Sequence, residues 1–134
     1  MIVADTNLIA YLNVAGERSS QAEQAFRKDP DWVAPFLWRS EFRNVLALYL
    51  RKGHLSLEGV REIMDAALDL MSGQEYDLAS SHVLGLATES VCSAYDCEFV
   101  ALAQNLGVRL VTVDKRILRE FPSAAVSLDS YVAE

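Results

Sequence analysis

Two short apolar runs, far apart in the sequence, each end at an aspartate. The chain opens with Met1-Ile2-Val3-Ala4 and then reaches Asp5, and the β-branched run 108–113 is followed by Asp114. Apolar runs of this length, bounded by residues that favour turns and helix N-caps, are typical of strands buried in a parallel sheet. If the two strands are neighbours, their carboxylates converge at the carboxyl edge of the sheet, where open α/β sheets bind ligands.

Between these strands the sequence alternates helix-like and strand-like segments. Residues 32–34 lie between Pro30 and Pro35 and are predicted to form a strand, while apolar residues at spacings of three and four predict a helix over 56–72. Residues 126–128 form a candidate last edge strand. Further helices are expected at 8–14, 19–28, 36–52, 78–90, 94–106 and 115–121. This alternation predicts an α/β fold with a mainly parallel sheet covered by helices on both faces.

Composition supports one globular domain spanning residues 1–134. Apolar residues make up 51 % of the chain and charged residues 23 %, values far from those of disordered chains. The formal charge of −7 excludes a basic protein that wraps nucleic acid, so any work on phosphates needs a local arrangement of charge. Two cysteines and two histidines do not suggest a zinc site.

No apolar run approaches the roughly 20 residues that a membrane-spanning helix needs. Asp5 also interrupts the first apolar run before the core of a signal peptide could form. We therefore expect no membrane association and a cytoplasmic location.

Two further acids occupy the apolar side of their predicted helices. The helical neighbours of Glu41 include Trp38, Val45 and Leu48, and those of Asp96 are Phe99, Val100 and Ala103. An acid that points inward needs a cation, a hydrogen-bond network or water, because carboxylates are almost never buried alone. Glu41 and Asp96 thus join Asp5 and Asp114 as candidate site residues.

Each acid also has an ordinary structural interpretation. Asp5 and Asp114 fit helix N-caps, Asp96 fits a capping box with Ser93, and Glu41 could turn to solvent or pair with a nearby arginine. A single metal site would explain all four acids together. Ligation by oxygen alone suits Mg²⁺ or Mn²⁺ rather than zinc.

Taken in order, several short motifs resemble the PIN-domain ribonucleases, and in particular the VapC-type toxins of bacterial toxin–antitoxin pairs. The motifs are Val3-Ala4-Asp5-Thr6-Asn7, Ser40-Glu41-Phe42, Tyr95-Asp96 with Val100-Ala101-Leu102-Ala103, and Leu110-Val111-Thr112-Val113-Asp114. The resemblance spans essentially the whole chain. It implies a three-layer α/β/α fold around a twisted, mainly parallel sheet.

The resemblance also implies roles for individual residues. Asp5, Glu41, Asp96 and Asp114 would form the acidic quartet that holds Mg²⁺ or Mn²⁺. Asn7 and Thr112 match polar positions that support such a site. Many relatives carry another acid shortly after the last aspartate, whereas this chain continues Lys115-Arg116-Ile117, so a full second metal site is in doubt.

The function expected from these residues is metal-dependent hydrolysis of RNA. The ion would neutralise the scissile phosphate and activate a water for attack. Candidate phosphate contacts are Arg39, Arg43, Lys115, Arg116 and Arg119, although such charges are usually only solvated. Trp38 and Tyr95 could stack on a base, but core packing is the favoured interpretation for both.

By resemblance, an antitoxin protein would bind and silence this chain, and the protein would form a homodimer. The residues themselves do not show dimerisation. Met64 and Met71 share a helical stripe that could serve an interface, but a core stripe is the preferred interpretation.

Two alternative functions remain open. One is a binding module for RNA or a protein partner that keeps the fold without turnover, although the intact quartet argues against it. The other is a Mg²⁺-dependent phosphatase or receiver-like domain, which also places aspartates at strand ends. A phosphatase usually needs a second Asp two residues after the first, and Asn7 occupies that position.

Overall fold

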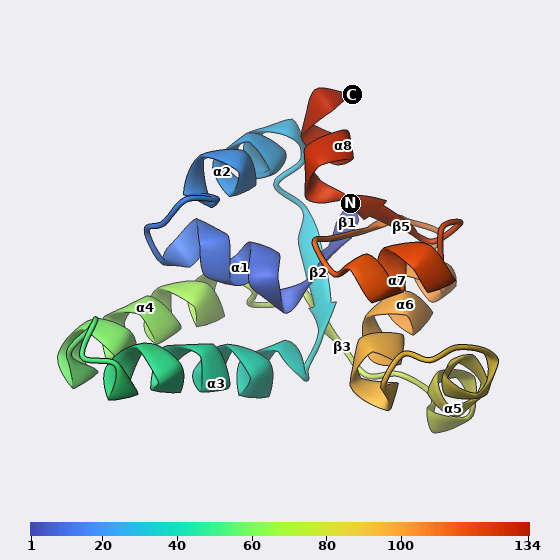
Figure 1. The fold of residues 1–134 in the computed structure, drawn as a ribbon, viewed down its shortest axis with the longest axis horizontal. Helices are drawn as coiled ribbons and strands as arrows, with labels where there is room; N and C mark the ends of the chain where they lie inside the picture. The colour runs from blue at the N-terminus through green and yellow to red at the C-terminus, as the bar shows by residue number, and fades with distance from the viewer.

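A five-stranded parallel sheet forms the centre of the computed structural model, which describes all residues from 1 to 134 (Figure 1). Its strands are β1 (Ile2–Ala4), β2 (Trp32–Pro35), β3 (Glu75–Tyr76), β4 (Leu110–Thr112) and β5 (Ala125–Ser127), in the spatial order β3-β2-β1-β4-β5. Every pairing is parallel. Val3 lies opposite Leu110 and Ala4 opposite Val111, so β1 and β4 are neighbours with their carboxyl ends level.

Eight helices cover the sheet. They are α1 (Thr6–Asn13), α2 (Ser19–Lys28), α3 (Trp38–Arg51), α4 (Leu57–Leu70), α5 (Ser80–Glu89), α6 (Ala94–Leu106), α7 (Lys115–Glu120) and α8 (Leu128–Ala133). Right-handed crossovers place α1 to α4 on one face and α5 to α7 on the other. Accordingly, α1 packs against β1 and β4, while α6 packs against β1, β2 and β4. This three-layer α/β/α arrangement confirms the predicted fold class.

The core consists of the sheet and the inner surfaces of the helices that flank it. Every residue of β1, β2 and β4 is buried, as expected from their apolar runs. Trp38 and Phe42 of α3 and Phe99 of α6 are among the largest fully buried side chains. Met71 is also fully buried and Met64 packs against the core, which matches the core interpretation of the methionine stripe.

Two elements were absent from the sequence prediction. The edge strand β3 contains only Glu75 and Tyr76, which is too short to leave an apolar pattern. Helix α8 follows directly after β5, with the Ser127 hydroxyl as its N-cap acceptor. No helix of the structure combines the length and the apolar character that a membrane crossing requires.

The strand order creates one crevice at the carboxyl edge of the sheet. From β1 the chain moves outward to β2 and β3, and it then returns to β4 and continues to β5 on the other side. The gap between β1 and β4 is therefore the topological switch point, where ligands bind in sheets of this kind. Asp5 follows β1 and Asp114 follows β4 closely, so both stand at this crevice.

Candidate active site

Asp5 is the one acid among the buried residues of the chain. It is 8 % exposed and is the N-cap residue of α1. Its Oδ1 accepts a hydrogen bond of 2.8 Å from the Thr6 backbone N–H, and its Oδ2 accepts one from the Thr112 hydroxyl. Both oxygens are thus held in place by the chain itself.

Glu41 reaches the same region from α3. The Thr6 hydroxyl donates a hydrogen bond of 2.7 Å to its Oε1, which leaves Oε2 without a partner in the chain. Its side chain is half-buried, so the predicted inward orientation is confirmed. Thr6 was not among the predicted site residues, yet it bonds Asp5 through its backbone and Glu41 through its side chain.

Asp114 and Thr112 form a second local unit after β4. Asp114 is the N-cap residue of α7, and its Oδ1 accepts from the backbone N–H groups of Arg116 and Ile117 at 2.8 and 3.1 Å. The Asp114 N–H donates to the Thr112 hydroxyl at 3.0 Å, and that hydroxyl donates in turn to Asp5. Thr112 therefore links two of the predicted acids.

Asp96 lies in the first turn of α6. The Ser93 hydroxyl accepts from its backbone N–H at 3.1 Å, which is the N-cap bond of the capping box expected from the sequence. Helix capping and membership of an acidic cluster therefore coexist in Asp5, Asp96 and Asp114. The ordinary interpretation of these acids is structurally correct, and it does not exclude a functional one.

The charges of the four acids act on one another. Burial raises the pKa of Asp5 to about 6, and the carboxylates of Glu41 and Asp96 add to that rise. Burial also raises the pKa of Glu41, with a further contribution from Asp96, and the pKa of Asp96, with a further contribution from Asp114. Negative charge is thus concentrated at this crevice, where a cation would relieve the repulsion.

The donor set matches the chemistry of Mg²⁺ or Mn²⁺, because it consists of carboxylate oxygens with threonine hydroxyls beside them. In the side-chain positions of this structure, however, no three acidic, histidine or cysteine residues lie close enough to share one ion. Metal binding here requires carboxylates to turn toward one another. Glu41 and Asp114 each have one carboxylate oxygen without a hydrogen-bond partner, which is available for this.

The family of the chain follows from its sequence as a whole. The model of the PIN domain family matches residues 2–122. This chain belongs to the PIN domain family. The match includes all four acids, and it confirms the family that the short motifs suggested.

Known PIN-like proteins are similar to this chain over nearly its full length. It is 28 % identical to Ribonuclease VapC3 of Pyrobaculum aerophilum over 125 residues, covering 91 % of this chain and 95 % of that protein. The crystal structure of PAE2754 from Pyrobaculum aerophilum superimposes with a TM-score of 0.78 at 17 % identity, covering 98 % and 93 % of the two chains. A toxin–antitoxin complex from Klebsiella pneumoniae gives a TM-score of 0.70 at 19 % identity, with coverage of 96 % and 98 %.

The other predicted site residues of this PIN domain occupy varied positions. Asn7 is exposed at the start of α1, beside the buried Asp5 and Thr6. Arg43 is exposed on α3 and takes part in no ion pair. Arg39 is instead bound to Glu75 through two hydrogen bonds of 2.5 and 2.6 Å, so its guanidinium is already occupied within the chain.

The two candidate stacking residues differ in exposure. Trp38 is fully buried, as expected, and its indole N–H donates to Glu75 at 2.9 Å. Tyr95 is 63 % exposed, so the expected core packing is wrong for this residue. The buried face of α6 begins only at Cys97, while Ala94 and Tyr95 at the start of the helix are exposed.

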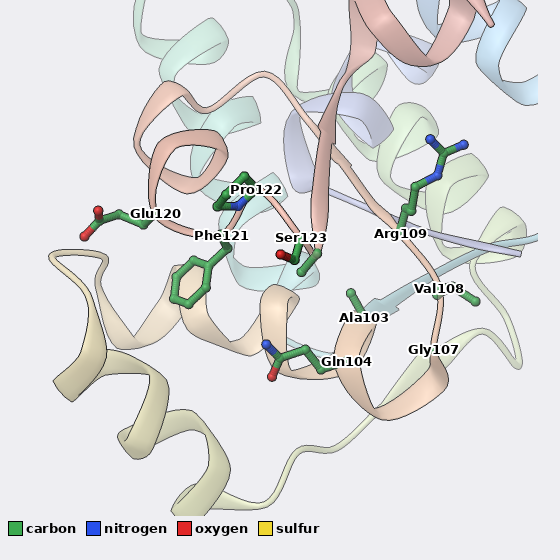
Figure 2. Close-up of a pocket in the computed structure, with 10 residues that line it drawn as sticks. Ala103, Gln104, Gly107, Val108, Arg109, Glu120, Phe121, Pro122 and Ser123 are labelled. Atoms are coloured by element: carbon green, nitrogen blue, oxygen red, sulfur yellow. The ribbon is translucent and has the colours of Figure 1, made fainter.

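A separate cleft of about 500 Å³ lies between the end of α6 and the α7–β5 loop (Figure 2). Gln104 and Phe121 border it, while the Arg109 guanidinium points away from it toward Glu134. Its residues Val108 and Arg109 precede β4, which places the cleft at the opposite edge of the sheet from Asp114. The cleft is therefore distinct from the acidic crevice.

Proposed function

We propose that this PIN-domain protein is a metal-dependent endoribonuclease and the toxin of a toxin–antitoxin pair, acting in the cytoplasm. The observation that supports the proposal is that acids from four separate segments act on one another through their charges beside the switch point between β1 and β4. The 28 % identity to a protein named Ribonuclease VapC3 supports RNA as the substrate. Asp5, Glu41, Asp96 and Asp114 are the catalytic and metal-binding residues of this proposal.

The residues of this site would each have a separate role in the reaction. A bound Mg²⁺ or Mn²⁺ would neutralise the scissile phosphate and lower the pKa of an attacking water. Thr6 and Thr112 hold Asp5 in place, and Thr112 also fixes the backbone at Asp114. Glu41 Oε2 is free to accept a proton or to bind the ion. Asn7 would support the site from its exposed edge.

Cleavage of total bacterial RNA by the purified chain tests the proposal. We expect discrete fragments with Mg²⁺ or Mn²⁺, none with a chelator, and none from Asp5→Asn or Asp96→Asn. Asp65→Asn is the matched control, because Asp65 is exposed on α4 and lies outside the acidic crevice. Cleavage that survives in both site variants would contradict the assignment of the acids.

A cognate antitoxin and a second copy of the chain are the protein partners of this proposal. Support comes from the similarity to the Klebsiella pneumoniae toxin–antitoxin complex, which shares the fold. Co-expression with the product of an adjacent small gene should give a stable complex and suppress RNA cleavage. For the chain alone, light scattering should report twice the 14.9 kDa of one chain, and a mass of 14.9 kDa would contradict the dimer.

A further inference from the structure

Three cations without ion-pair partners gather in one cleft beside the acidic crevice. The chain carries 12 Lys and Arg against 19 Asp and Glu, so unpaired cations are scarce on an acidic surface. A cleft of about 520 Å³ is lined only by Asp114, Lys115, Arg116 and Arg119, and we call it the charged cleft. The ion pairs of the structure involve other cations, namely the N-terminal amine, Arg18, Lys28, Arg39 and Arg109.

The charged cleft lies beside the acidic crevice. Asp114 belongs to both, and the charge of Arg116 acts on Asp96. A hydrogen bond of 2.9 Å from the Val91 N–H to Glu120 also ties the loop before α6 to α7. The loop before α6 and the C-terminal end of α7 therefore lie next to one another.

Tyr95, which immediately precedes Asp96 on α6, presents an exposed aromatic ring. A ring that is 63 % exposed contributes little to the core, in contrast to the fully buried Trp38. Exposed aromatic rings beside cationic grooves are the usual platforms on which bases of single strands stack.

We propose that the charged cleft binds backbone phosphates of a single-stranded RNA while the Tyr95 ring stacks on one of its bases. This inference rests on the nuclease function proposed above, and it assigns that site two RNA contacts, one cationic and one aromatic. A paired base is covered by its neighbours and cannot reach a protruding ring, so the substrate is unpaired at this position. Arg39 takes no part, because Glu75 occupies it.

The test is binding of a fluorescein-labelled RNA of mixed sequence, about ten nucleotides long, measured by anisotropy with a chelator present to prevent cleavage. We expect Tyr95→Ala to weaken binding about tenfold and Tyr95→Phe to restore it, because phenylalanine keeps the ring. Arg119→Gln should reduce the slope of log affinity against log salt by about 0.7, the loss of one phosphate contact. Both residues changed are exposed to solvent, and melting curves will verify that the three variants fold.

Arg61→Gln provides the matched control. It removes the same charge from an exposed, unpaired position on α4, so it should leave the salt slope unchanged. The same RNA annealed to its complement should bind more weakly and should not respond to Tyr95→Ala. Equal effects of Arg119→Gln and Arg61→Gln, unchanged binding by Tyr95→Ala, or no binding of the single strand by the parent would each overturn the inference.

The binding assay separates this inference from the nuclease function. If the parent cleaves RNA with metal but the variants bind as the parent does, the two contacts are wrong and the nuclease stands. If the variants lose binding but the parent never cleaves, the contacts stand and the chain is a binding module.

Discussion

Among single residues, Asp5 bears the largest electrostatic penalty of the candidate site. Its carboxylate is buried and accepts only two hydrogen bonds, while two other acids act on it from nearby. In an acid, a pKa above the unfolded value means that the folded state binds the proton more tightly than the unfolded state does. Without metal, the charged form of Asp5 therefore lowers the stability of the fold.

We expect Asp5→Asn to stabilise the metal-free protein at about pH 8, by at most about 3 kcal/mol. The parent should gain stability as the pH falls through about 6 toward the unfolded value of 3.8, because the folded state then holds the proton. The variant should lack most of this gain. Urea unfolding with a chelator at several pH values measures both effects.

Asp65→Asn, on the exposed side of α4, should unfold as the parent does. A less stable Asp5→Asn at about pH 8 would show that the hydrogen bonds to Asp5 outweigh its desolvation.

The sequence predicted the four acids but not all of their neighbours. Strand ends and helical periodicity singled out Asp5, Glu41, Asp96 and Asp114, and in the structure the charges of these acids act on one another. Thr6 was missed because its hydrogen bond to Glu41 depends on the packing of α3 beside α1. The only hint in the sequence was that a residue with a hydroxyl group directly follows Asp5. Tyr95 was misjudged because apolar neighbours along the chain do not reveal on which side of a first helical turn a ring emerges.

Among the elements, the two-residue strand β3 is held in place by side-chain hydrogen bonds as well as by backbone pairing. The side chain of Glu75 is 7 % exposed, and it accepts hydrogen bonds from both Arg39 and Trp38 of α3. A strand of two residues is too short to show an apolar or alternating pattern, so the sequence could not reveal β3. The long helices were predicted within a few residues because each carries a periodic apolar face, whereas the six-residue α8 is too short to show one.

We expect Glu75→Gln to destabilise the protein by about 1–2 kcal/mol, since it removes the charge that holds Arg39 and weakens the bond to Trp38. The effect is moderate because the Arg39 side chain is 38 % exposed and water screens the pair. Chemical denaturation measures the change. Glu62→Gln, an exposed residue of α4, should have no effect.

Unchanged stability of Glu75→Gln would mean that backbone pairing to β2 alone holds β3 in the sheet. In that case Arg39 would also regain its place among the candidate RNA contacts.

For the whole molecule, the acidic crevice makes stability depend on divalent ions. We expect Mn²⁺ at about a hundred times its dissociation constant to add about 2.7 kcal/mol, which raises the melting temperature by several degrees. Asp5→Asn and Asp114→Asn should reduce this shift, whereas Asp65→Asn should retain it. Differential scanning fluorimetry with and without Mn²⁺ measures it, and a parent curve that Mn²⁺ does not move would argue against the quartet.

The strand order also has a consequence for synthesis of the protein. β1 is made first, but its second neighbour in the sheet is β4, more than a hundred residues later in the chain. Asp5 and Asp114 can come together only after most of the polypeptide has emerged from the ribosome. Pairing of such distant segments is slow compared with helix formation. We therefore expect nascent and truncated chains to be harmless to the RNA that surrounds them, so that catalytic competence arises only at the end of translation.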